Sequence, residues 1–137
     1  MRHSIENHRL RISIDDVGAE LASLVNFDSG KEYIWQADPD VWGSHAPVLF
    51  PIIGMLKDGE TQIDGKTYRI PKHGMVRRND KLELFNHSED LITFRMCWSE
   101  ETLKTYPYKF DFRITYRLRN EHVKNRPLLT TASPRDP

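Results

Sequence analysis

Residues 110–118 read Phe-Asp-Phe-Arg-Ile-Thr-Tyr-Arg-Leu, and apolar residues occupy every second position of this stretch. Successive side chains of a β-strand point to opposite faces, so a period of two is typical of a strand with one buried face. A second run of this kind places Leu10, Ile12 and Ile14 on one face. The chain is therefore expected to be all-β, with its strands joined as an antiparallel meander.

Further strands are expected on both sides of these runs. A tight hairpin is predicted around Asp64-Gly65, because this dipeptide tolerates the positive φ that a two-residue turn needs. The other predicted strands are Leu21–Phe27, Glu32–Trp35, Leu82–Asn86 and Leu91–Trp98, the last two joined by a polar turn over residues 87–90.

The connecting segments follow from their turn and capping residues. Ser99 is a predicted N-cap for a short helix that ends near Lys104. Pro47 and Pro51 indicate that residues 38–55 form an extended surface stretch rather than a central strand. Cys97 is the one cysteine of the chain and is expected to be a small buried residue.

The end of the chain departs from the alternating pattern. After Val123 the sequence contains three prolines and no period of two. We therefore divide the chain into residues 1–123, a β-sandwich portion, and residues 124–137, an irregular tail. Because a strongly alternating strand runs into this tail, we hypothesise that it is non-native, from a vector or a shifted reading frame. Intact mass and the encoding DNA test this.

Composition narrows the classes of partner. The 137 residues carry 20 basic and 20 acidic side chains, so the formal net charge is zero. A chain without net charge has no overall electrostatic attraction to nucleic acid or to an anionic membrane, so a neutral small molecule is the expected partner. The chain has no run of 18 apolar residues and no signal-like N-terminus, so we expect a cytoplasmic protein.

Several stretches together give a more specific indication. They are Asp16–Leu24, Glu32–Pro39 with Trp42, Pro47–Gly54, Asp64–Tyr68, Pro71–Arg77 and Glu101–Tyr108. In order and spacing they resemble the aldose 1-epimerase (galactose mutarotase-like) family, in particular its uncharacterised epimerase-like subgroup. The resemblance covers residues 5 to 123 and implies the N-terminal part of a large antiparallel β-sandwich with a sugar cleft.

The resemblance also implies a chemistry. The family interconverts the α and β anomers of aldoses, which needs a base for the C1 hydroxyl and an acid for the ring oxygen, and no metal or redox cofactor. His73 matches the first of the family's two active-site histidines and is the catalytic candidate, and Arg77 matches the arginine of its His-Gly-x-x-Arg form. Met55 stands where the family usually has a sugar-binding arginine.

The family's second histidine and its catalytic glutamate have no match after Tyr116. We therefore expect weak or no epimerase activity, because loss of one acid or base group costs about 10² to 10⁴ in rate. Two alternatives stay open: a non-catalytic sugar-binding β-sandwich module, and a hexose-6-phosphate epimerase-like protein that uses Lys72, Arg77 and Arg78.

Two more residues are expected to bind sugar. Trp42 lies in a polar loop and is a candidate for stacking on a sugar ring, and His45 follows it closely. Trp35 is expected in the core, and the other histidines show no metal-site spacing. A part of a sandwich would expose sheet edges, so we also expect a homo-oligomer.

Overall fold

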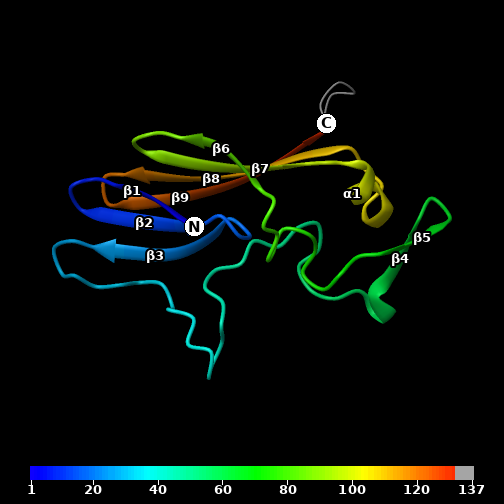
Figure 1. Ribbon diagram of the computed structural model, residues 1–137, viewed down its shortest axis with the longest axis horizontal. Helices are drawn as coiled ribbons and strands as arrows, with labels where there is room; N and C mark the ends of the chain where they lie inside the picture. Colours follow the sequence, from blue (N-terminus) through cyan, green and yellow to red (C-terminus); the bar gives the residue numbers. More distant parts are fainter. Residues whose placement is uncertain (132–137) are drawn as a thin grey trace.

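The computed structural model describes residues 1–131, in which β-strands dominate (Figure 1). The elements in chain order are β1 (Arg2–Glu6), β2 (Leu10–Asp15), β3 (Glu20–Asn26), a short 3-10 helix (Lys57–Gly59), β4 (Glu60–Ile63), β5 (Lys66–Arg69), β6 (Glu83–His87), β7 (Leu91–Cys97), α1 (Glu100–Thr105), β8 (Phe110–Arg119) and β9 (His122–Thr131). All named strand pairs are antiparallel, and each sheet is a meander in chain order: β1-β2-β3, β4-β5 and β6-β7-β8-β9. The all-β prediction is confirmed.

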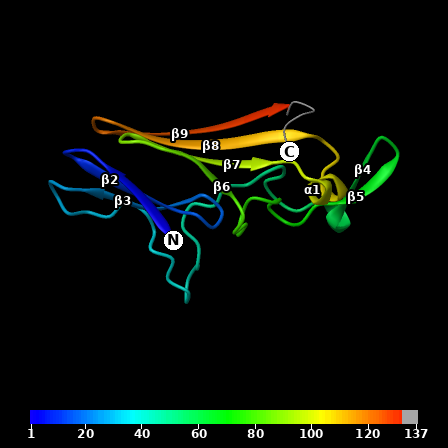
Figure 2. The same ribbon diagram turned by 45° about the horizontal axis from the view of Figure 1, so that its top comes forward.

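Two of the sheets pack face to face, as Figure 2 shows for β2 and β3 below β6–β9. The alternating residues of both sequence runs meet in this core, where Ile12 and Ile14 are fully buried and Tyr116 and Ile114 are nearly so. The Tyr116 hydroxyl donates to the backbone carbonyl of Ala19 across the layers at 2.8 Å. The period of two in residues 110–118 therefore identifies the inner face of the central strand correctly.

The predicted hairpin and helix are both present. Asp64 and Gly65 have φ of 51° and 76° and form the two-residue turn between β4 and β5. Ser99 caps α1, its hydroxyl accepting from the Thr102 amide at 3.1 Å. Cys97, expected to be buried, is only half-buried at the end of β7.

The predicted strand at Glu32–Trp35 is wrong, because only an isolated bridge joins Glu32 to Val25. The Glu32 carboxylate replaces the missing ladder by accepting from the amides of Leu24 and Ile34 and from the Ser23 hydroxyl. Burial opposes ionisation, but these hydrogen bonds hold the pKa of Glu32 below its usual value.

The stretch of residues 38–55 contains no named strand, as expected, but it does not lie wholly on the surface. Phe50 is only 8% exposed, and its ring stacks on that of Phe112 with centroids 4.6 Å apart. Phe50 therefore packs this irregular stretch against the core and so positions the loop that follows it.

The prediction of an irregular tail from residue 124 is wrong for residues 124–131. These residues belong to β9, which pairs with β8 along its whole length, from Arg119 opposite His122 to Phe110 opposite Thr131. Pro127 is tolerated because β9 is an edge strand. The remainder of the expected tail, residues 132–137, lies outside the described residues. Whether the segment is native stays a prediction.

Candidate functional site

Two loops far apart in the sequence meet next to the core and place the catalytic candidate. Phe50 and Gly74 form a parallel bridge, and the Met75 amide donates to the Phe50 carbonyl at 2.6 Å. Gly74 has a φ of 85°, and an added Cβ would lie 2.0 Å from the Phe50 oxygen. Only glycine fits at this position, because both the backbone conformation and the close approach exclude a side chain.

His73 is held by the loop that Phe50 anchors. Its amide donates to the Gly54 carbonyl at 2.8 Å, and its ring Nδ1 lies 2.5 Å from the Ile53 carbonyl oxygen. A carbonyl oxygen can only accept, so Nδ1 carries the proton and Nε2 is the nitrogen left for a ligand. His73 also has a φ of 68°, which is uncommon for a residue other than glycine and is found at ligand-binding loops.

Arg77 lies at the other end of the same loop and is half-buried. Its Nη2 donates to the Ser44 hydroxyl at 3.2 Å, which joins the loop to the segment of Trp42 and His45. Its buried Nε has no hydrogen-bond partner within residues 1–131. The arginine thus fixes the loop on one side while part of its guanidinium donor capacity stays unused.

His45 is paired with an acidic residue that the sequence did not indicate. Its ring Nδ1 lies 3.6 Å from Oε1 of Glu20, and both side chains are largely buried, at 12% and 15% exposure. The His45 backbone amide also donates to the same carboxylate oxygen. Burial first, and then the charge of Glu20, raise the pKa of Tyr116 on the core side of this pair.

Trp42 and His45 line one hollow of about 690 Å³, together with apolar residues of the 46–49 stretch, of β8 and of β9. Trp42 is 46% exposed, so part of its ring is free for stacking. The indole N–H of Trp35 donates to the Trp42 carbonyl at 2.7 Å and thereby supports this loop. Trp35 is itself 44% exposed, so the prediction that it lies in the core is wrong.

The structure therefore links three of the four candidates directly. Trp42 and His45 share a hollow, and Arg77 donates to Ser44, which lies between them in the sequence. His73 lies on the adjoining loop, where Ile53 and Gly54 hold it, and Met55 next to them is 71% exposed. Glu20 is the residue that sequence reasoning missed, because nothing local to a strand start reveals a contact with residue 45.

A comparison with protein-family models assigns the chain to a family. The family model described as aldose 1-epimerase matches residues 1–127. The chain belongs to the aldose 1-epimerase family. Among curated proteins, the chain is similar to the plasmid-encoded protein LacX of Lactococcus lactis subsp. lactis, with 33% identity over 134 aligned positions. The match covers 90% of this chain and 42% of LacX.

Two solved structures of the same fold are also similar to this aldose 1-epimerase family member. A galactose mutarotase related enzyme from Lactobacillus acidophilus has 43% identity and a TM-score of 0.88, covering 94% of this chain and 43% of its own. A galactose mutarotase-like protein from Lactobacillus casei ATCC 334 has 34% identity and a TM-score of 0.89, covering 96% and 44%. The chain thus spans less than half the length of these relatives, and its β-sandwich is of the galactose mutarotase type.

Two further observations concern the described residues. Within residues 1–131, no helix is long and apolar enough to cross a membrane. Nor do three or more histidine, cysteine, aspartate or glutamate side chains gather anywhere in this part of the chain in a way that would hold a metal ion.

Proposed function

We propose that this chain is the sugar-binding N-terminal portion of an aldose 1-epimerase-like protein, and that alone it interconverts anomers weakly or not at all. The observation that carries the proposal is the fixed orientation of the His73 ring, whose Nδ1 donates to the Ile53 carbonyl and leaves Nε2 for a ligand. Donation to the ring oxygen of an aldose as the ring opens needs a proton on Nε2 as well, so we assign this step to His73 in its doubly protonated form, with Nε2–H as the donor. In this proposal Trp42 stacks on the sugar, and Arg77 and His45 complete the polar contacts.

Anomer exchange needs a second group that removes the proton from the C1 hydroxyl. The family's usual base has no match in this sequence, and this is the reason for the low activity that we propose. Within the described residues, the His45–Glu20 pair is the arrangement closest to a base and its orienting carboxylate, with His45 Nδ1 3.6 Å from Glu20. We assign His45 to binding, because 3.6 Å is too long for an orienting hydrogen bond and the backbone amide of His45 already donates to the same Glu20 oxygen.

The test is polarimetry on freshly dissolved α-glucose and α-galactose. We expect no acceleration above the spontaneous rate for the unaltered chain, for His73→Ala, or for the matched control His8→Ala, whose histidine is exposed and outside these loops. An acceleration that His73→Ala abolishes and His8→Ala retains would show that this chain supplies a base. His45→Ala would then test whether the base is the His45–Glu20 pair.

Sugar binding is tested separately by calorimetry with the same two sugars. We expect binding that Trp42→Ala weakens by roughly tenfold or more, since a ring contact contributes about 0.5–1.5 kcal/mol beyond the area that it buries. The neighbouring Val41 is 72% exposed, so Val41→Ala is the control and should bind normally. Absence of binding by the unaltered chain would contradict the proposal.

Two alternatives remain on specific observations. A non-catalytic sugar-binding module is favoured by the hollow that Trp42 lines, and it predicts binding without any catalysis. A hexose-6-phosphate epimerase-like protein needs the cations near His73 to hold a phosphate. Arg77 already donates to Ser44, whereas Lys72 and Arg78 are exposed, so this second alternative has the weaker support.

A further inference from the structure

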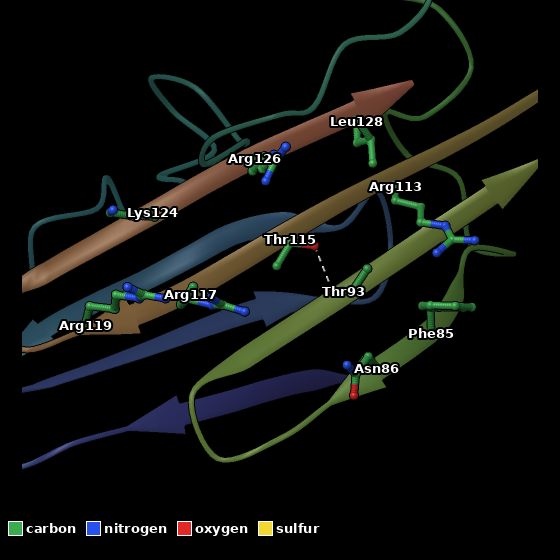
Figure 3. Close-up of a pocket in the computed structure, with 10 residues that line it drawn as sticks. All are labelled: Phe85, Asn86, Thr93, Arg113, Thr115, Arg117, Arg119, Lys124, Arg126 and Leu128. Atoms are coloured by element: carbon green, nitrogen blue, oxygen red, sulfur yellow. Dashed lines mark hydrogen bonds between the residues drawn. The ribbon is translucent and has the colours of Figure 1, made fainter. Parts of the chain in front are cut away.

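The face of the β6–β9 sheet that points away from β1–β3 is strongly basic. The polar positions of β8 alternate with its core positions, and the strand pairing places Arg117 directly opposite Lys124 and Thr115 directly opposite Arg126. Figure 3 shows these side chains on the outer side of the sheet, with β1–β3 behind it. Like charges directly opposite each other on a sheet are destabilising, so this arrangement needs a reason beyond folding.

Acidic side chains do not neutralise these cations. Asp111 on this face accepts from Arg95 and Arg113 at distances of 3.0 to 3.2 Å. Glu83, which lies opposite Arg95 in the strand ladder, forms an ion pair with Arg95 at 3.8 Å. Glu121 in the β8–β9 turn forms an ion pair with Arg9 at 2.8 Å. Within residues 1–131, the four cations without an ion pair on this face are Arg117, Arg119, Lys124 and Arg126.

These cations surround a hollow of about 510 Å³, which lies within the usual size range of small-molecule sites. The hydroxyls of Thr93 and Thr115 form part of its floor and are hydrogen-bonded to each other at 2.8 Å. At one end Arg113 lies over the Phe85 ring, with 4.2 Å between the guanidinium carbon and the ring centroid. The four cations therefore gather around one hollow rather than being dispersed over the surface.

We propose that this face binds a small condensed phosphate, a diphosphate or triphosphate group held by Arg117, Arg119, Lys124 and Arg126. A phosphate monoester brings only about two negative charges at neutral pH and would leave cations unmatched. A condensed phosphate brings more charge in a compact group, and arginine forks suit its oxygens. The net charge of the whole chain is zero and these four cations line one hollow, which favours a small anion over nucleic acid.

The site is independent of the sugar function proposed for His73. Lys124 and Arg126 also lie within residues 1–127, the part that matches the family model. The experiment is calorimetry on the full chain at low salt, with orthophosphate, pyrophosphate and tripolyphosphate as probes. We expect affinity to rise in that order and to fall as salt is added.

The variants are Arg117→Gln and Lys124→Glu, with Lys57→Glu as a control of equal charge change on an exposed lysine elsewhere. Each site variant should weaken tripolyphosphate binding roughly tenfold or more, since a charged hydrogen bond contributes that much. Lys124→Glu should also raise the melting temperature, because it places opposite charges across the strand pair. If Lys124→Glu melts at a higher temperature and yet binds tripolyphosphate more weakly, the loss of binding is not caused by unfolding. His73→Ala should bind normally.

Several outcomes would overturn the proposal: no binding of pyrophosphate or tripolyphosphate, equal affinity for all three probes, or equal weakening by Lys57→Glu. Tighter binding of a single-stranded oligonucleotide than of tripolyphosphate would instead assign the face to nucleic acid. Binding of ATP with an affinity higher than that of tripolyphosphate, or equal to it, supports the site. The first result identifies a nucleoside phosphate as the source, and the second identifies free condensed phosphate.

Discussion

Gly74→Ala should destabilise the chain severely and displace His73. The new Cβ would lie 2.0 Å from the Phe50 oxygen and 2.3 Å from its carbonyl carbon, so the two loops must separate by more than 1 Å. That movement breaks the hydrogen bond from the Met75 amide to the Phe50 carbonyl, at a cost of about 1–3 kcal/mol if the groups stay buried. The positive φ adds about 1–2 kcal/mol, which gives a total of roughly 2–5 kcal/mol.

A loss of this size is a large part of the 5–15 kcal/mol that stabilises a typical domain. It is measured as the change in the free energy of unfolding from urea denaturation followed by circular dichroism. Gly54→Ala is the matched control, because an added Cβ at Gly54 meets nothing within 4 Å. We expect the control to change stability by less than about 1 kcal/mol. Equal effects of the two substitutions would refute the account of how the loop is held.

Three further predictions concern the sandwich itself. Tyr116→Phe should cost about 1–3 kcal/mol of unfolding free energy, measured by urea denaturation, because it leaves the buried Ala19 carbonyl unpaired. Burial of the Asp111 carboxyl opposes ionisation, but hydrogen bonds from Arg113 and Arg95 hold its pKa below the usual value. Its stabilising effect is therefore complete above about pH 4 and lost as pH falls further, and Asp111→Asn should remove this acid dependence in pH-dependent melting. The edge strands β6 and β9 should pair between copies of the chain, and a monodisperse monomer in light scattering would contradict this.

An element of the fold could be predicted from the sequence where neighbouring residues decide its structure. Period-two alternation around Ile114, the Asp64-Gly65 turn and the Ser99 cap are each decided by neighbouring residues, so sequence alone located the strand, the hairpin and the helix. The strand β9 gave no such signal, because its side chains are almost all exposed and no apolar face recurs along it. It forms through its backbone ladder with β8, and only the partner strand reveals that ladder.

The sequence by itself determined an antiparallel β-sandwich, the family resemblance, and the motif residues His73 and Arg77. Only the tertiary structure decided which nitrogen of His73 is left for a ligand, that Glu20 lies against His45, and that Arg117 faces Lys124. Each of these facts depends on how one segment pairs with another in space: loop against loop for His73, strand start against loop for Glu20, and strand register for Arg117. Local propensity determines how a strand alternates, whereas the position of its faces relative to distant residues is set only when the sheets pack.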